Sequence, residues 1–163
     1  MANPGPGGGT SNLVFFTVTR NRNSVGLGLV SSLPVGSPES AAVGDFNGDG
    51  KLDLALANYY GQTVSILLGD GKGNFTLASS PPAGIYADSV AVGDFNGDGK
   101  LDLAVANQCA AGTCGLPSTV SILLGDGTGN FTPAPSPAVG YQPMSVAMGD
   151  LNGDGNQIGR AHV

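Results

Sequence analysis

A nine-residue stretch rich in oxygen-bearing side chains occurs twice in this chain. DFNGDGKLD covers residues 45–53 and is repeated letter for letter at residues 94–102. In such a loop the side-chain oxygens at the first, third, fifth and ninth positions, with the backbone carbonyl at the seventh, can converge on a hard cation that prefers roughly six to eight oxygen ligands. Three carboxylates so close together would repel one another without a cation. The pattern therefore predicts a calcium-binding loop in each copy.

Calcium is favoured over magnesium because Mg²⁺ demands a tighter octahedron and keeps its waters. Gly50 and Gly99 stand at the sixth position, where a sharp turn favours a residue that can adopt positive φ. An EF-hand or dockerin loop shares the opening positions, but it needs an acidic residue at the twelfth position and a helix on each side. The twelfth position is Leu56 or Val105. The flanking segments are predicted to be strands, so the helical alternative is rejected.

The two loops belong to a longer internal repeat. The copies begin at Asp45 and Asp94, so the period is about 50 residues, which is typical of a stacked or radial array. We expect the following organisation: a Gly/Pro-rich linker (1–12), a diverged half repeat (13–38), a repeat (40–80), a repeat with an inserted loop at 108–119 (89–134) and a truncated repeat (144–156).

Within each repeat the apolar residues follow a period of two. DLALAN (53–58) and TVSILLG (63–69 and again 119–125) present apolar residues on both faces, as expected of strands covered on two sides. Four such runs make up each repeat. An antiparallel four-stranded sheet with both faces against its neighbours is a propeller blade. The predicted fold class is therefore all-β, a β-propeller built from four-stranded antiparallel blades and present as a partial array of about two and a half blades.

The run GDFNGDGKLDLAVAN followed by TVSILLGDGTGNF resembles the FG-GAP or VCBS repeat family, the calcium-loop propeller blades of integrin alpha-subunit heads and of many large secreted bacterial proteins. The match covers roughly residues 40–156. The resemblance implies a propeller, usually of seven blades, with calcium loops between the first and second strands and a role in adhesion or ligand recognition. It assigns the first site to Asp45, Asn47, Asp49, Lys51 through its carbonyl, and Asp53. It assigns the second site to Asp94, Asn96, Asp98, Lys100 through its carbonyl, and Asp102.

A third copy of the loop departs from this pattern. Asp150, Asn152 and Asp154 are candidate ligands of a third metal site, but Ile158 stands where the ninth-position aspartate is expected. The tail QIGRAHV (157–163) reads as the translation of a sequencing adapter, so we expect a non-native tail on a fragment of a longer chain with further blades.

Two cysteines and a pair of glycine-rich turns carry further expectations. Cys109 and Cys114 lie in the inserted loop, where a disulfide is favoured over free thiols and would indicate an oxidising compartment. This loop is the largest difference between the two repeats, which makes it a candidate partner-binding element. The runs GDGKGN (69–74) and GDGTGN (125–130) are predicted to be hairpin turns rather than further metal sites.

Composition and charge exclude several classes of function. The net charge is −6 and most of the 12 acidic residues lie in the repeated loops, while no basic stripe exists to neutralise nucleic-acid phosphates. No run of residues is long and apolar enough for a membrane span, and the first residues do not form a signal peptide. The carboxylates recur identically in each repeat and no serine, cysteine or histidine constellation accompanies them, so we do not expect an enzyme.

Two functional classes remain. One is a calcium-stabilised module that recognises a protein or glycan. The other is a calcium-stabilised scaffold attached to a separate domain, such as a catalytic one. Loops without an acidic twelfth position bind calcium weakly, at about 0.1 to 1 mM in extracellular modules. We therefore expect the protein at the cell surface or secreted.

Overall fold

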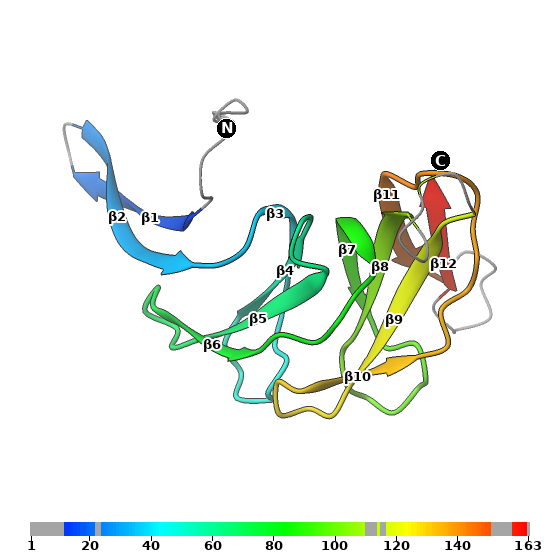
Figure 1. Ribbon diagram of the computed structural model, residues 1–163. Helices are drawn as coiled ribbons and strands as arrows, with labels where there is room; N and C mark the ends of the chain where they lie inside the picture. The colour runs from blue at the N-terminus through cyan, green and yellow to red at the C-terminus, as the bar shows by residue number, and fades with distance from the viewer. Residues whose placement is uncertain (1–11, 22–23, 110–113, 115–116, 151–157, 163) are drawn as a thin grey trace.

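The regular structure of the chain is entirely β. The computed structural model describes residues 12–21, 24–109, 114, 117–150 and 158–162, and every regular element among them is a strand. Two four-stranded antiparallel sheets lie side by side, with a two-stranded sheet at each end of the chain (Figure 1). This arrangement confirms the all-β prediction of partial propeller blades; the described strands form no closed ring.

The two four-stranded sheets are the first and second blades. The first blade contains β3 (Pro38–Gly44), β4 (Asp53–Asn58), β5 (Thr63–Gly69) and β6 (Phe75–Ser79), paired in that order. The second blade contains β7 (Ile85–Gly93), β8 (Asp102–Cys109), β9 (Thr119–Gly125) and β10 (Phe131–Ala134), again paired in chain order. The strands predicted at 53–58, 63–69 and 119–125 have the bounds of β4, β5 and β9.

The central strands are buried on both faces, as the sequence predicts. Leu56, Ile66 and Leu67 in the first blade have no exposed surface, and neither do Leu103 and Leu123 in the second. Alanines fill the alternate positions of β4 and β8, where they are buried in the two hydrophobic clusters. The outer strands β6 and β10 are mostly exposed.

The hydrophobic core lies between blades. One cluster joins the facing surfaces of the first and second blades, including Ala57, Ile66, Val90 and Leu103. A second cluster continues from the second blade to Val146 on β11. A serine hydroxyl also crosses each interface: Ser40 Oγ accepts the N–H of Val90 at 3.2 Å, and Ser89 Oγ accepts the N–H of Val146 at 3.3 Å. Each blade is therefore stabilised mainly by its neighbours, as in other repeat arrays.

Two-stranded sheets flank the blades. β1 (Asn12–Asn21) pairs with β2 (Ser24–Pro34), and β11 (Ser145–Gly149) pairs with β12 (Ile158–His162). The expected diverged half repeat at 13–38 contains the β1–β2 hairpin. β12 lies within the expected non-native tail, and it pairs with β11 as β4 pairs with β3. Residues 1–11 of the expected linker (1–12) lie outside the described residues, and Asn12 begins β1. The origin of the tail stays a prediction.

A disulfide closes part of the inserted loop. Cys109 and Cys114 are bonded, and the Cys109 side chain is buried at the end of β8. The expected disulfide is therefore present. Residues 110–113 and 115–116 of the inserted loop lie outside the described residues. In the part of the chain that the structure describes, no helix has the length and hydropathy needed to cross a membrane.

Candidate metal-binding loops

The first acidic loop connects β3 to β4 and is organised around Asp45. One oxygen of this carboxylate accepts the backbone N–H groups of Gly48 at 2.8 Å and Asp49 at 3.1 Å, and the other accepts the N–H of Gly50 at 2.8 Å. The chain can curl around the carboxylate because Gly48 and Gly50 have φ of 73° and 79°. The expected requirement for glycine at the sixth position is confirmed.

The side chains at the third and fifth positions tighten the same turn. Asn47 Oδ1 accepts the N–H of Asp49 at 3.0 Å, and Asp49 Oδ1 accepts the N–H of Lys51 at 2.9 Å. Each is a short-range Asx turn, in which a side-chain oxygen replaces a backbone carbonyl as the acceptor. Asp45, Asn47 and Asp49 therefore all belong to one compact polar loop.

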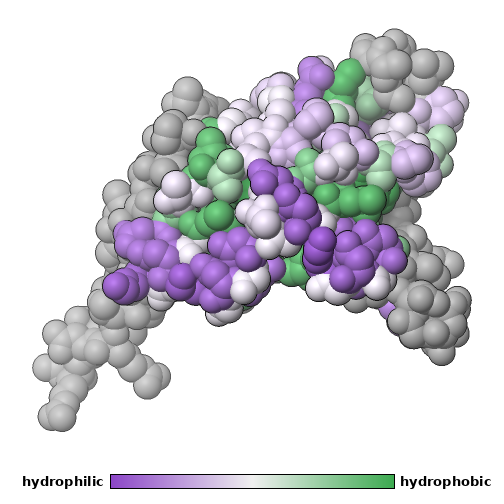
Figure 2. Space-filling view, turned by 90° about the horizontal axis from the view of Figure 1, so that it is seen from below, coloured by the Kyte–Doolittle hydropathy of each residue, from purple (hydrophilic) through white to green (hydrophobic). Residues whose placement is uncertain are grey.

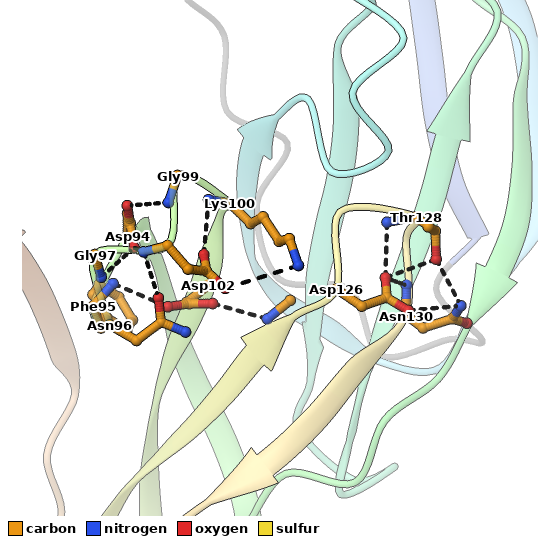
Figure 3. A network of polar contacts seen from close by, with 12 residues as sticks. Asp94, Phe95, Asn96, Gly97, Gly99, Lys100, Asp102, Asp126, Thr128 and Asn130 are labelled. Atoms are coloured by element: carbon orange, nitrogen blue, oxygen red, sulfur yellow. Dashed lines mark hydrogen bonds and ion pairs between the residues drawn. The ribbon is translucent and has the colours of Figure 1, made fainter.

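The second acidic loop, between β7 and β8, repeats this geometry (Figure 3). Asp94 accepts the N–H groups of Gly97 at 2.8 Å, Asp98 at 3.2 Å and Gly99 at 2.8 Å. Asn96 and Asp98 form the same two Asx turns, with distances of 2.9 Å each. The backbone N–H of Gly99 is the main cause of a lowered pKa at Asp94, which favours the charged form. Identical sequences have folded into the same loop twice.

The ninth-position aspartates have structural partners that the sequence did not indicate. Asp53 is fully buried; its Oδ2 accepts the N–H of Phe46 at 2.9 Å, and its Oδ1 accepts the N–H of Gly69 at 2.8 Å. Asp102 is also fully buried and accepts the N–H groups of Phe95 and Gly125 at 2.9 and 2.8 Å. These carboxylates tie each acidic loop to the end of the third strand of its blade. Their assignment as metal ligands stays a prediction.

The lysine at the seventh position of each loop lies near the carboxylate at the fifth position. Lys51 Nζ lies 2.8 Å from Asp49 Oδ2, and Lys100 Nζ lies 3.9 Å from Asp98 Oδ2. The hydrogen bond from the Lys51 ammonium lowers the pKa of Asp49, and Asp49 raises the pKa of Lys51. The nearby carboxylate attracts the ammonium group, although both side chains keep substantial exposure to water.

The donor chemistry of the loops fits a calcium ion. Each carboxylate or amide oxygen has about two lone pairs. Among the described residues of the first loop, Asp45 Oδ2 and Asn47 Oδ1 each accept one hydrogen bond, and Asp49 Oδ2 accepts one from the exposed Lys51 ammonium. All three side chains therefore keep an oxygen able to bind a cation, and the Lys51 carbonyl follows in the same loop.

The described residues do not contain three or more His, Cys, Asp or Glu side chains gathered closely enough to hold a metal ion by themselves. Asp45 and Asp49 accept backbone N–H groups within the loop, while Asp53 is engaged at the base of the blade. Of the third loop, Asp150 is described and exposed, while Asn152 and Asp154 lie outside the described residues. Its assignment also stays a prediction.

The glycine-rich runs form hairpin turns, as predicted. Asp70 accepts the N–H groups of Lys72 at 2.7 Å and Asn74 at 3.1 Å, and the turn joins β5 to β6. Asp126 accepts the N–H of Thr128 at 2.7 Å in the corresponding turn between β9 and β10. Both acidic loops and the β9–β10 turn lie at one end of the blades, and hydrophilic side chains gather on that end (Figures 1 and 2).

An aromatic cluster at the opposite ends of the blade strands was not anticipated. Tyr59 stacks on Tyr86 with ring centroids 4.8 Å apart, and Tyr60 meets both rings edge-on while remaining 72% exposed. The Tyr59 hydroxyl donates to Gln108 at 3.0 Å, and Gln108 donates to Asp88 at 3.1 Å. The sequence signal for this cluster was the pair Tyr59–Tyr60 in the short β4–β5 loop. Its other members, Tyr86 and Gln108, belong to the next blade and could not be identified from the sequence.

The comparison with known protein families agrees with this repeated geometry. A family model described as FG-GAP-like repeat matches residues 45–105 and 110–157. The chain belongs to the FG-GAP-like repeat family. The first match contains the two identical acidic loops, and the second contains residues 150–157 of the third. A search of curated proteins finds no match to the chain.

Proposed function

We propose that this chain is a calcium-binding propeller module that recognises a ligand outside the cytosol. The observation that carries the proposal is the pair of acidic loops, in which identical oxygen-rich sequences adopt the same fold. Asp45, Asn47, Asp49 and the Lys51 carbonyl would hold the ion in the first loop, with Asp53 as the predicted further ligand. Asp94, Asn96, Asp98, the Lys100 carbonyl and Asp102 would do the same in the second. A bound Ca²⁺ would neutralise the carboxylates and cross-link the loop.

The ends of the blades opposite the acidic loops support the recognition role. The acidic loops and the third strands are identical in sequence in the two repeats, but the β4–β5 connection YYGQ corresponds to a longer, disulfide-closed connection in the second blade. The tyrosine cluster lies on the same side, and Tyr60 is largely exposed. Aromatic side chains with a few placed polar groups are typical of binding surfaces. A protein or glycan ligand is therefore proposed to bind there.

An extracellular location agrees with two features of the chain. The disulfide between Cys109 and Cys114 is of a kind that persists in oxidising compartments. Loops without an acidic twelfth position are expected to need about 0.1 to 1 mM calcium, a concentration available outside cells.

Isothermal titration of the full chain with Ca²⁺ tests the metal-binding part of the proposal. We expect one ion per intact loop, so Asp45→Ala and Asp94→Ala should each remove one binding event and the double variant should remove both. Asp70→Ala, which changes an aspartate in a hairpin turn, is the matched control and should leave both events. Heat of binding that survives the double variant unchanged would refute the assignment of the two loops.

Recognition is tested separately from metal binding. Probing a printed array of glycans and extracellular-matrix proteins with the labelled chain, in calcium and in chelator, should give binding that Tyr60→Ala weakens. A calcium-dependent fold that binds nothing on the array would instead favour the scaffold alternative.

A further inference from the structure

The first acidic loop is in contact with the second blade. The turn between β9 and β10 reaches across the interface, where the N–H of Gly129 donates to the carbonyl of Phe46 at 3.0 Å. The Phe46 ring, only 2% exposed, packs edge-on against Phe131 with centroids 5.7 Å apart. Phe46 is the second residue of the acidic loop, so a residue between two proposed ligands is held by the neighbouring blade.

The turn is fixed on its other side as well. Ser79 Oγ, at the end of β6, donates to the carbonyl of Gly129 at 2.7 Å. Gly129 has φ of 87°, and a Cβ placed on it would lie 3.3 Å from the Leu68 side chain. Gly129 therefore has a backbone conformation that favours glycine, and a Cβ there would press against the end of the Leu68 side chain.

Phe46 links this interface to the proposed ligands. Its N–H donates to Asp53 at 2.9 Å, and its carbonyl accepts from Gly129, so the peptide groups on both sides of its Cα are fixed. The φ and ψ of Phe46 determine how the neighbouring Asp45 and Asn47 are placed relative to each other. The first of these two bonds lies within the first blade, and the second comes from the next blade.

The second acidic loop has only the first of these two bonds among the described residues. The N–H of Phe95 donates to Asp102 at 2.9 Å, as in the first blade. The Phe95 ring is half-buried and packs in the cluster that contains Val146 and Met148, and no described turn donates to its carbonyl. Among the described residues, the first of these two identical loops therefore receives one more hydrogen bond from a neighbouring blade than the second.

We infer that Gly129 and Phe131 are positioning residues for the first calcium loop, so that calcium binding at residues 45–53 is coupled to docking of the second blade. This inference rests on the proposed calcium binding. A loop that is held in place loses less conformational freedom when it binds a ligand, so the first loop binds calcium more tightly than the second. By linkage, calcium strengthens the docking of the turn by the same factor.

Nuclear magnetic resonance of the full chain resolves the two loops. The backbone amides of Gly50 and Gly99 report each loop separately during a Ca²⁺ titration. We expect the dissociation constant of the first loop to be about three- to tenfold lower than that of the second, the effect of one net hydrogen bond. Gly129→Ala should remove most of this difference by weakening the first loop alone.

Gly73→Ala is the matched control, because Gly73 occupies the corresponding position in the β5–β6 turn with φ of 96°. Both substitutions place a side chain on a residue with positive φ. If each turn acted only on its own blade, Gly129→Ala would weaken the second loop and Gly73→Ala the first. Coupling across the interface predicts that Gly129→Ala weakens the first loop and leaves the second unchanged.

Hydrogen exchange of the unsubstituted chain provides a readout that needs no variant. Calcium should slow exchange of the Gly129 amide at least about threefold. The amide of Asp126, which bonds within its own turn to Asn130 at 3.1 Å, should not change. Suppose that Gly50 and Gly99 shift with calcium at equal affinities and that the exchange of the Gly129 amide does not change. This result would overturn the coupling but leave the proposed calcium binding intact. The absence of shifts at either glycine would overturn the proposed calcium binding as well.

Discussion

Asp53 and Asp102 illustrate how a residue expected to bind a metal also supports the fold. Each carboxylate is fully buried and accepts two backbone N–H groups, which come from the acidic loop and from the end of the third strand. A buried carboxylate can be accommodated because both of its oxygens have donors. The loop, whatever it binds, is thereby anchored to the blade.

Asp53→Asn tests this anchoring role. An amide keeps one acceptor oxygen but turns an N–H₂ group toward a backbone donor, so we expect the free energy of unfolding to fall by about 1 to 3 kcal/mol. Urea unfolding in the presence of chelator measures the change without any contribution from calcium. Asp49→Asn, in the same loop but exposed, should change the stability by less than about 0.5 kcal/mol. Equal effects of the two substitutions would contradict the anchoring role.

The hydrogen bonds of Asp126 lead us to predict how its contribution to stability depends on pH. The hydroxyl of Thr128, followed by backbone and amide donors, lowers the pKa of Asp126 from 3.8 to about 2. Because the folded-state pKa is depressed, the stabilisation is present above pH 3.8 and is lost as the pH falls through about 2. Carboxyl carbon shifts should therefore show Asp126 still ionised at about pH 3. Thr128→Ala should raise this pKa towards its ordinary value, and an unshifted titration in the wild type would contradict the prediction.

At the scale of the elements, the sequence predicted the blades well. Period-two runs and repeated turns located β4, β5 and β9 to the residue, because both faces of these strands must be apolar. It could not predict the contacts of Phe46 with Gly129 and Phe131, which join residues distant in the chain. The sequence signal for these contacts was the phenylalanine at the second position of both acidic loops. The partners of Asp53 were missed for the same reason, since the motif gives types and spacing but not side-chain direction.

The ends of β5 and β9 require glycine for a steric reason. A Cβ on Gly69 would lie 2.3 Å from the carbonyl oxygen of Leu52, and a Cβ on Gly125 would lie 2.2 Å from that of Leu101. We expect Gly69→Ala or Gly125→Ala to lower the free energy of unfolding by about 1 to 3 kcal/mol, because backbone must move. Thermal or urea unfolding measures this change. Gly50→Ala has open space for its Cβ and isolates the contribution of positive φ alone; a loss as large as that of Gly69→Ala would contradict the steric explanation.

The disulfide affects the β8–β9 connection in particular. Closing a loop between Cys109 and Cys114 should stabilise the fold by about 2 kcal/mol, mainly through the entropy of the unfolded chain. A variant with both cysteines replaced by serine should unfold at a correspondingly lower urea concentration. Reducing agent should have the same effect on the wild type and none on the variant. If reduction leaves the unfolding midpoint of the wild type unchanged, the bond does not stabilise the domain.

At the scale of the whole molecule, the core lies between the blades. Residues from both blades form the main cluster, and a second cluster extends to β11. The approximate repeat period was enough to predict this array, because a blade cannot bury both faces alone. The repeat period alone did not predict that the first acidic loop forms a hydrogen bond with the next blade. Metal binding, folding and blade docking are therefore expected to be linked in this protein.

Thermal unfolding of the full chain in excess chelator, in millimolar Mg²⁺ and in a Ca²⁺ series tests the central claim most directly. A loop at a hundredfold excess of Ca²⁺ over its dissociation constant contributes about 2.7 kcal/mol. We therefore expect the melting temperature to rise with Ca²⁺ by at least about 5 °C, and not with Mg²⁺. The double variant Asp45→Ala/Asp94→Ala should abolish this rise. A melting temperature that is the same in chelator and in saturating Ca²⁺ would show that the two loops are acidic turns and not calcium sites.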